Sequence, residues 1–501
     1  MLASILLSKK EQKKLKITYF LETLPAGEYS VKSINDGLGF AYSSTQSLLM
    51  EMLEDFRALQ DQKESFFSPQ GQLCWEPGLV TYEQYFSFLI RRSIPYQALL
   101  FMLQFPEKEL VNFCEIQYIS IASAMRYLQP LAEYIQQFGL TFNRSKLTLK
   151  GDERLIRLTF FNFVWAVSKG SEELFHHFEE GELATTLAAL KQEVPLGQDY
   201  VGIKEIYLFA EITYIRTKQG FYVEDDPRYD GILVVDSPLA PENLQAFFPL
   251  TAEKLKGEYR FIQFMYHYAP TYTDPNDPRL PIMQSHLQQK NQLNKLLECF
   301  EQFWSKKILR GDTDLLKKNP NIHGNLYNVL FCYYVFPQRI PNLFDLLLYF
   351  RKNQSVLFET LKERVTAFFQ QFMKRQEFDW LQGCNGCLAE LFTWLTLEYF
   401  EESGQKQPLY VSLIMEANQL FQQDIKAHLR DLSFVELLPF SIHEVERYDY
   451  LICSSVALLP EGNQTPFFVF NFFSNSTNYV ALYRDLQKHH RKKNLAYKLP
   501  Q

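Results

Sequence analysis

The chain has 501 residues, of which 47% are hydrophobic and 16% aromatic, and its formal net charge is −7. This length is too great for one hydrophobic core and predicts three to five domains. The acidic balance excludes a uniformly basic nucleic-acid-binding surface, so any such surface has to be local. Seven scattered cysteines favour a reducing compartment over a disulfide framework. Because no apolar run reaches the roughly 20 residues of a membrane span and the start does not resemble a signal peptide, we expect a cytoplasmic protein without a membrane partner.

The first segment predicts a helix-turn-helix module. A helix over residues 8–24 precedes a short helix that Ser30 caps, and Ser43 is expected to open a longer helix with one apolar face. Residues 65–75 are predicted to form a small hairpin, or wing. An ordinary surface pair of helices is the alternative. The lysines of the first helix are Lys9, Lys10, Lys13, Lys14 and Lys16, and the polar residues expected to lie exposed for phosphate or base contacts are Ser43, Ser44, Thr45, Gln46 and Ser47.

A second module follows an aromatic, leucine-rich helical region over residues 81–105. We expect a helix over residues 107–116, a turn, and a helix from Ser120 that Gly139 ends and Pro130 kinks. Strands over residues 140–142 and 147–149 then form a hairpin with a basic tip, so the pattern is a winged helix-turn-helix. The residues predicted to face DNA are Ser120, Ser123, Arg126 and Tyr127 on the helix, and Arg144 and Lys146 on the wing.

The residues after this wing carry a family resemblance. Gly151, Asp152 and Glu153 precede Ile156 and Arg157 in an aromatic helix that ends at Trp165. Together with the serine-started helix and the short wing, they resemble the Mga/AtxA transcription regulators of Gram-positive bacteria. The resemblance implies two DNA-binding modules, two helical regulation domains of the sugar-phosphotransferase type, and a C-terminal domain like phosphotransferase component IIB.

Two helical blocks occupy residues 166–280 and 281–402, separated by a Pro- and Asp-rich linker. Periodicity alone indicates two helical bundles. The resemblance implies regulation domains that histidine phosphorylation controls, with histidines of no special role as the alternative. The preferred candidates are His267 and His323, among a set that also contains His176, His177 and His286.

The last segment, residues 408–501, alternates strands with helices and predicts a small parallel α/β sheet. Its strands are expected at residues 409–415, 434–438, 450–453 and 467–472, and the arrangement resembles component IIB. Component IIB proteins accept phosphate on a cysteine directly after the first strand, and that cysteine is missing here, so we expect a domain without that chemistry. A crowded set of apolar side chains predicts a homodimer interface, namely Phe467, Phe468, Phe470, Phe472 and Phe473.

Catalytic and metal-binding motifs are weak. Cys384 and Cys387 form a lone CxxC pair without the two further ligands that structural zinc requires, and Cys453 is interpreted as a packing residue. We therefore expect no enzyme activity, no metal and no cofactor. The expected partners are double-stranded DNA, a second copy of the chain, and phosphocarrier proteins of the phosphotransferase system. An RNA-binding antiterminator is the alternative, but a helical N-terminus suits the major groove of DNA better than the deep groove of RNA.

These inferences predict a multidomain, mainly α fold. Two winged helix-turn-helix modules come first, two helical-bundle regulation domains follow, and a component IIB-like α/β domain ends the chain. The expected bounds are residues 1–78 and 79–165, then 166–280 and 281–402, then 408–501.

Overall fold

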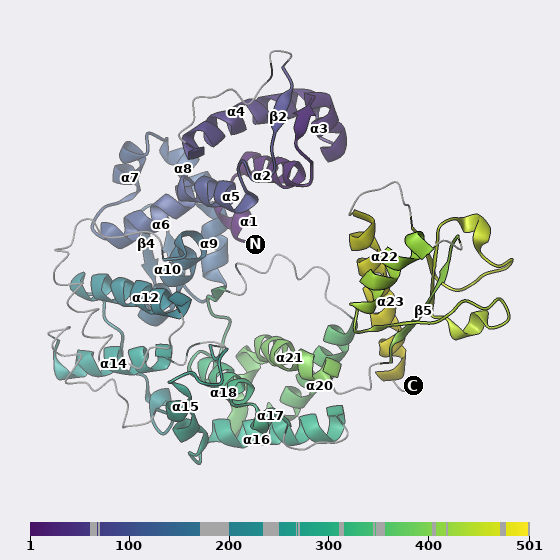
Figure 1. The fold of residues 1–501 in the computed structure, drawn as a ribbon. Helices are drawn as coiled ribbons and strands as arrows, with labels where there is room; N and C mark the ends of the chain where they lie inside the picture. The colour runs from purple at the N-terminus through teal and green to yellow at the C-terminus, as the bar shows by residue number, and fades with distance from the viewer. Residues whose placement is uncertain are drawn as a thin grey trace. The chain divides into compact units, whose positions relative to one another are not determined.

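The computed structural model describes most of the chain. The described residues are 1–60, 68, 71–170, 200–233, 250–266, 268, 271–309, 315–343, 346, 356–402, 407–416, 419–470 and 477–498. The chain divides into two compact units, one comprising residues 1–303, 313–354 and 364–392, the other residues 304–312, 355–363 and 393–501. Helices dominate and a small sheet lies near the C-terminus, which confirms the mainly α class (Figure 1). The five-domain division stays a prediction.

Two helices of the first module begin at serine caps, of which the cap at Ser30 was predicted. Ser8 accepts a hydrogen bond from the backbone of Glu11, whose side chain bonds back to the Ser8 N–H, and Ser30 accepts from the Ser33 N–H. Gly39 ends the short helix at a φ of 66°, where a side chain would be strained. The elements are α1 (Leu2–Leu6), α2 (Lys9–Glu22), β1 (Gly27–Tyr29), α3 (Val31–Leu38), α4 (Tyr42–Gln60) and β2 (Leu73–Trp75).

The described residues cover only part of the wing predicted for this module, so that hairpin stays a prediction. Within the described chain, β2 pairs antiparallel with β1, with Gly27 opposite Trp75 and Tyr29 opposite Leu73. The hairpin predicted over residues 65–75 assumed a partner strand just before the turn, and most of that segment lies outside the described residues. The partner of β2 lies more than forty positions earlier in the sequence, and local turn residues cannot indicate such a pairing.

The second module follows the predicted order. Its helices and strands are α5 (Tyr82–Arg91), α6 (Ile94–Gln104), α7 (Leu110–Ile116), α8 (Ile121–Tyr127), α9 (Gln129–Gln136), β3 (Thr141–Asn143), β4 (Thr148–Lys150) and α10 (Glu153–Ser168). Every residue of α10 from Arg154 to Ser168 is buried. This helix packs against α5 and α6 on the module side and against α12 (Tyr200–Lys218) of the first helical block. Because α10 runs past residue 165, the predicted boundary between module and block falls inside one buried helix.

Charged side chains on α10 form a buried network with the first helical block. Arg157 donates from Nη1 and Nη2 to the carboxylate of Glu258 on α14 (Ala252–Tyr266), at 2.6 and 2.8 Å, and both side chains are 0% exposed. Glu153 accepts from the Nε of Arg157 at 3.1 Å and from Arg216 of α12 at 2.7 and 2.8 Å. Burial alone would lower the pKa of Arg157, but the adjacent Glu258 carboxylate outweighs burial and raises it. The guanidinium therefore stays charged in the interior.

Among the described residues, the loop after α18 contacts the second module. After α18 (Pro320–Val335), the Gln338 amide donates to the carbonyl of Phe138 at 3.0 Å. Arg339 donates to the side-chain oxygen of Gln137 at 2.6 Å, and Asn162 of α10 donates to the Pro341 carbonyl at 3.2 Å. We call residues 336–342 the strap. They contact the C-terminal end of α9 and connect it to α18.

The remaining helices of the blocks pack through aromatic rings. The Phe300 ring lies 5.4 Å from that of Phe368 and 4.8 Å from that of Phe392. Among the described residues no helix is both long and apolar enough to cross a bilayer. The elements not yet named are η1 (Pro227–Tyr229), α15 (Leu280–Leu287), α16 (Gln292–Phe303), the π-helical turn η2 (Trp304–Leu309), α17 (Leu315–Lys318), α20 (Val356–Phe372), η4 (Gln376–Gly383) and α21 (Asn385–Glu402).

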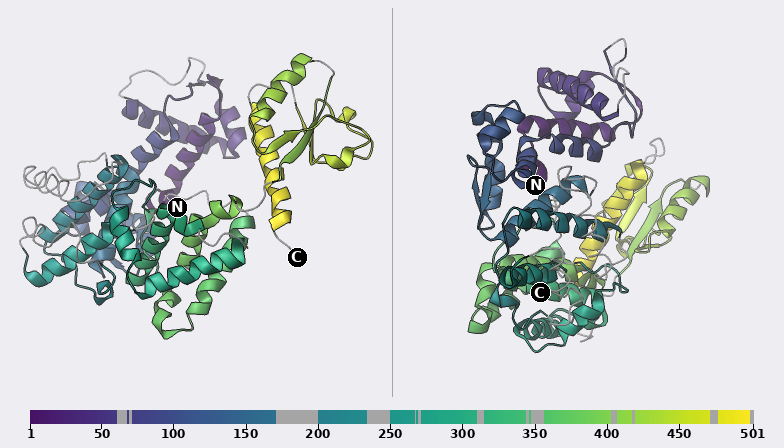
Figure 2. Two further views of the ribbon diagram at one scale, coloured as in Figure 1. Left: turned by 60° about the horizontal axis from the view of Figure 1, so that its bottom comes forward. Right: turned by 90° about the vertical axis from the view of Figure 1, so that its left-hand side faces the viewer.

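The C-terminal segment forms the predicted parallel sheet, with strand order β6-β5-β7-β8. The helix α23 runs along this sheet, as two further views show (Figure 2). One face packs on α22 and α23 through residues such as Val411, Ile425 and Leu486, and the other face packs on loop residues including Tyr448. The elements are β5 (Leu409–Ile414), α22 (Gln419–Arg430), β6 (Val435–Leu437), η5 (Val445–Arg447), β7 (Tyr450–Cys453), η6 (Val456–Leu458), β8 (Phe467–Val469) and α23 (Thr477–Lys498).

Candidate nucleic-acid interface

The helix predicted to read DNA in the second module is short. Ser120 caps α8 by accepting from the Ser123 N–H at 3.2 Å, and its hydroxyl donates to the Ser123 hydroxyl at 3.0 Å. Pro130 does more than kink the helix, since α8 ends at Tyr127 and a separate helix α9 begins at Gln129. Proline near the start of α9 is tolerated because the first N–H groups of a helix lack helical partners. The reading helix is therefore confined to α8.

The predicted contact residues of α8 differ in exposure. Ser120 and Arg126 are exposed, whereas Ser123 and Tyr127 are half-buried. The Arg126 guanidinium lies 5.5 Å from the centre of the Tyr127 ring. Tyr118, in the turn before α8, is 95% exposed with a φ of 51° and was not among the predicted contacts. Its position in the turn was visible in the sequence, but nothing there distinguished it from the other turn residues.

The wing is a two-stranded hairpin of β3 and β4, with Thr141 opposite Lys150. Lys146 is exposed at its tip. Arg144 is half-buried, and its Nη1 donates to the Met125 carbonyl of α8 at 2.9 Å. Arg144 was expected to point freely from the wing, and instead it ties the wing to the reading helix. The hairpin is short enough that its basic side chains lie within reach of the helix before it.

In the first module, α4 begins at Tyr42, so Ser43 lies inside the first turn and does not open the helix as predicted. Ser43, Gln46 and Ser47 are exposed and Ser44 is half-buried. Thr45 is 0% exposed, and its hydroxyl donates to the side-chain oxygen of Asn35 on α3 at 2.9 Å. The expectation that Thr45 is exposed is therefore wrong, because its side chain connects α4 to α3. Short polar residues look alike in sequence on either face of a helix.

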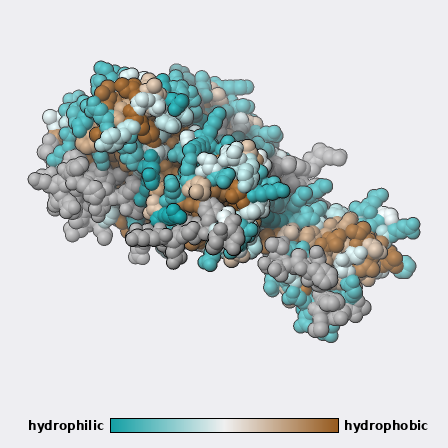
Figure 3. Space-filling view, turned by 90° about the horizontal axis from the view of Figure 1, so that it is seen from above, coloured by the Kyte–Doolittle hydropathy of each residue, from teal (hydrophilic) through white to brown (hydrophobic). Residues whose placement is uncertain are grey.

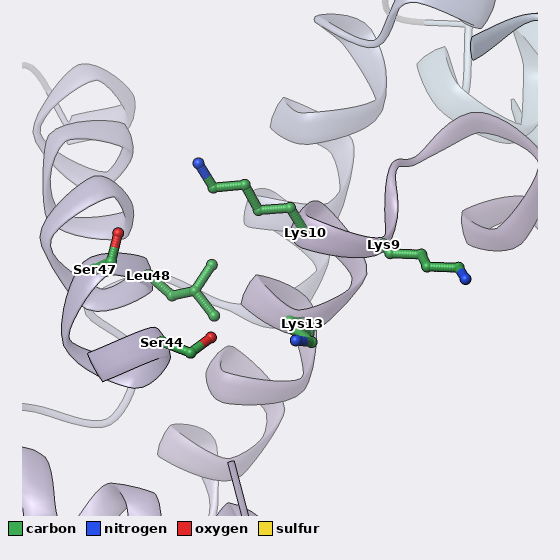
Figure 4. A pocket seen from close by; sticks show the side chains of 6 residues that line it. All are labelled: Lys9, Lys10, Lys13, Ser44, Ser47 and Leu48. Atoms are coloured by element: carbon green, nitrogen blue, oxygen red, sulfur yellow. The ribbon is translucent and has the colours of Figure 1, made fainter. Parts of the chain in front are cut away.

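A basic cleft of about 290 Å³ lies between α2 and the start of α4. Its lining consists of Lys9, Lys10, Lys13, Ser44, Ser47 and Leu48 (Figure 4). The two serines were predicted contacts, but the lysines were treated only as part of a lysine-rich helix. The signal was present in their spacing, since Lys9 and Lys13 are four residues apart and share one face of α2.

The regulatory candidates lie elsewhere. His267 is outside the described residues. His323, in the first turns of α18, places its Nε2 3.0 Å from an oxygen of Glu301 on α16, and its side chain is 20% exposed. Lys317 approaches the other oxygen of the same carboxylate at 3.4 Å. Glu301 is 3% exposed, so this histidine faces a nearly buried carboxylate between two helices.

The cysteines are placed by packing. Cys384 and Cys453 are buried, and burial raises the pKa of both thiols, which disfavours the reactive thiolate. Among the described residues no cluster of three or more His, Cys, Asp or Glu side chains could hold a metal ion.

Comparison with known families shows what the second module is similar to. Residues 80–164 match the model of the Mga helix-turn-helix domain, a segment that contains α8, the wing and most of α10. By this match, residues 80–164 are similar to an Mga helix-turn-helix domain. The capsule synthesis positive regulator AcpB of Bacillus anthracis is 23% identical over 136 residues, which is 27% of this chain and 28% of that protein. The chain therefore matches little more than a quarter of that relative's length. The two matches confirm the resemblance to the Mga/AtxA family.

Proposed function

We propose that this chain is a transcription regulator that binds duplex DNA through its Mga helix-turn-helix domain. The observation that carries the proposal is the match of residues 80–164 to that domain, in which α8 and the wing present two basic side chains. Arg126 is exposed on α8, and Lys146 is exposed on the wing beside it. A short helix with an adjacent hairpin suits the major groove and the neighbouring backbone of DNA.

The residues of α8 suggest modest sequence selectivity. Ser120 and Ser123 have short side chains that bond each other, so few donors remain to read base edges. Arg126 has the fork geometry that recognises guanine, and Lys146 is suited to phosphate. We expect the shape and bendability of A·T-rich DNA to supply part of the preference. The first module, with α4 as its reading helix, is proposed to bind the same duplex.

DNA binding is tested by fluorescence anisotropy. DNA duplexes taken from the region upstream of the gene that encodes this chain are titrated with the protein at several salt concentrations. Arg126→Ala is expected to weaken binding by about 1–3 kcal/mol. Lys146→Ala is expected to lower the slope of log affinity against log salt by about one, which corresponds to one lost phosphate contact. Lys290→Ala, an exposed lysine of the helical blocks, is the matched control and should bind like the wild type. Equal affinity of all three variants at every salt concentration would refute this use of α8 and its wing.

The RNA-binding alternative is tested in the same assay with an RNA hairpin of equal length. The proposal requires tighter binding to DNA at equal salt, because A-form RNA has a major groove too narrow for a helix. The helical first 60 residues, with α2, α3 and α4 in place of a β-rich domain, favour DNA.

Control by histidine phosphorylation is the second part of the proposal, with His323 and His267 as candidates. A phosphoryl group on His323 would place about two negative charges beside the nearly buried Glu301 carboxylate. The resulting repulsion would break the His323–Glu301 contact and disturb the packing of α18 on α16. Incubation with phosphoenolpyruvate and the general phosphotransferase proteins, followed by mass mapping, should find phosphohistidine within residues 166–402 and no phosphocysteine in residues 408–501. Phosphate on Cys453 would contradict the proposal.

A homodimer is the third part, with the C-terminal domain supplying its interface. Phe467 and Val469 on the edge strand β8 are 41% and 40% exposed, while Phe470 belongs to the core of the domain. Phe472 and Phe473 lie outside the described residues. Apolar side chains gather on one face of this domain in a space-filling view (Figure 3). An exposed apolar edge strand favours pairing with a second copy.

A further inference from the structure

The cleft between α2 and α4 has the composition of an anion site. Three of its six lining residues are lysines and two are serines, so ammonium and hydroxyl donors surround a space of about 290 Å³. Pockets for organic cofactors are usually larger, and Leu48 is the one apolar residue among the six that line this cleft. The space suits a phosphate group and a few waters, since one water occupies roughly 30 Å³.

The carboxylates near this cleft are already neutralised. Glu51 of α4 bonds Lys10 at 2.6 Å and Lys14 at 3.2 Å, and Asp55 bonds Lys14 at 2.8 Å. Burial would raise the pKa of Glu51, but the hydrogen bonds and charges of the two lysines outweigh it and lower the pKa. Glu51 therefore stays ionised and occupies Lys10.

Lys9 and Lys13 retain their charge for a ligand. Both are exposed, and neither has a carboxylate partner within the part of the chain that the structure describes. The Lys13 ammonium lies 5.8 Å from the centre of the Phe40 ring. In Figure 4, Ser44 and Leu48 point from α4 toward α2, while Lys9 extends from α2 on the side away from α4. Its long side chain widens the positive surface beyond the cleft.

We propose that this cleft binds a backbone phosphate of duplex DNA, with Lys13 and Lys9 supplying charge and Ser44 and Ser47 supplying hydroxyl donors. The proposal rests on the proposed function, and it assigns to α2 a contact that the reading helices do not provide. Ser44 and Ser47 are three residues apart and line the cleft from the first turns of α4. A phosphate held there would fix where the start of α4 meets the DNA, because phosphate contacts set register while base contacts specify sequence.

The double variant Lys9→Gln/Lys13→Gln tests the cleft in the full chain. Loss of the Lys13 charge in the cleft and of the Lys9 charge beside it is expected to lower the slope of log affinity against log salt by about two. Between 100 and 200 mM salt the wild type should then lose about three- to fourfold more affinity than the variant. The loss should be the same for a specific and an unrelated duplex. Ser44→Ala/Ser47→Ala is expected to weaken binding without changing the slope, since it removes no charge.

The control Lys290→Gln/Lys374→Gln removes the same charge from exposed positions in the helical blocks and should leave the slope unchanged. Parallel salt plots for the cleft variant and the wild type would overturn the phosphate assignment while leaving DNA binding intact. A wild type that binds no duplex would overturn both proposals. Inorganic phosphate, added at constant ionic strength, distinguishes a free anion. If the cleft variant loses phosphate binding but keeps the wild-type slope on DNA, the cleft holds free phosphate and the proposal is wrong.

Discussion

The pair formed by Arg157 and Glu258 offers the sharpest stability test. Glu258→Ala would leave the guanidinium of Arg157 at 0% exposure with one remaining carboxylate, Glu153, on its Nε at 3.1 Å. It would also remove the acceptor of the Val223 N–H, now bonded at 2.8 Å. Breaking a buried pair by removing one partner costs about 3–5 kcal/mol, because the other charge stays uncompensated. We expect that cost in the unfolding of the first unit.

The control for this variant is Asp225→Ala. Asp225 pairs with Lys256 and Arg260 of the same α14, but these side chains are partly exposed, so the expected cost is below about 1 kcal/mol. A chain with two compact units need not unfold in one step. The urea midpoints should therefore be combined with measurements of amide hydrogen exchange in α10 and α14, which report local stability. The double variant Arg157→Met/Glu258→Leu should recover most of the loss. A Glu258→Ala variant within 1 kcal/mol of the wild type would refute the reasoning.

Three further results are expected. Thr45→Val should cost about 1 kcal/mol of stability through the lost bond to Asn35, with unchanged DNA affinity, measured by urea unfolding and anisotropy. Burial lowers the pKa of His286 below 6.5, so the unfolded chain binds more protons as the pH falls below that value and stability decreases. His286→Phe should reduce the difference in Tm between pH 7.5 and 5.5, and an unchanged difference would contradict the assignment. Phe467→Glu/Val469→Glu should shift the full chain from dimer to monomer in sedimentation velocity, and a persistent dimer would place the interface elsewhere.

Features set by neighbouring residues were predictable. The helix starts at Ser30 and Ser120 were expected from residue type and position, since a hydroxyl at a helix start accepts a backbone N–H. The strand Tyr450–Cys453 was predicted at its observed bounds because its four residues form one short apolar run.

Features that depend on distant segments were not predictable. The pairing of β1 with β2 and the contact of Arg157 with Glu258 join positions whose local sequence contains no sign of the partner. The side chain of Thr45 is buried, where its hydroxyl donates to the side-chain oxygen of Asn35. Helical periodicity predicts which residues share a face of a helix, but not which residues of another element pack against that face. The lysines of α2 were visible as a basic run, but the cleft required the start of α4 beside them.

The burial of α10 on all sides limits how this chain and its relatives can exchange parts. A chimaera could join residues 1–165 of one relative to the helical blocks of another. This junction would divide α10 between two parents. Arg157 would then meet a carboxylate position inherited from a different protein, and the strap would meet an unmatched Asn162. Recombinants that keep α10, α12, α14 and the strap from one parent preserve these contacts, so a segment that can be exchanged intact extends well beyond residues 80–164.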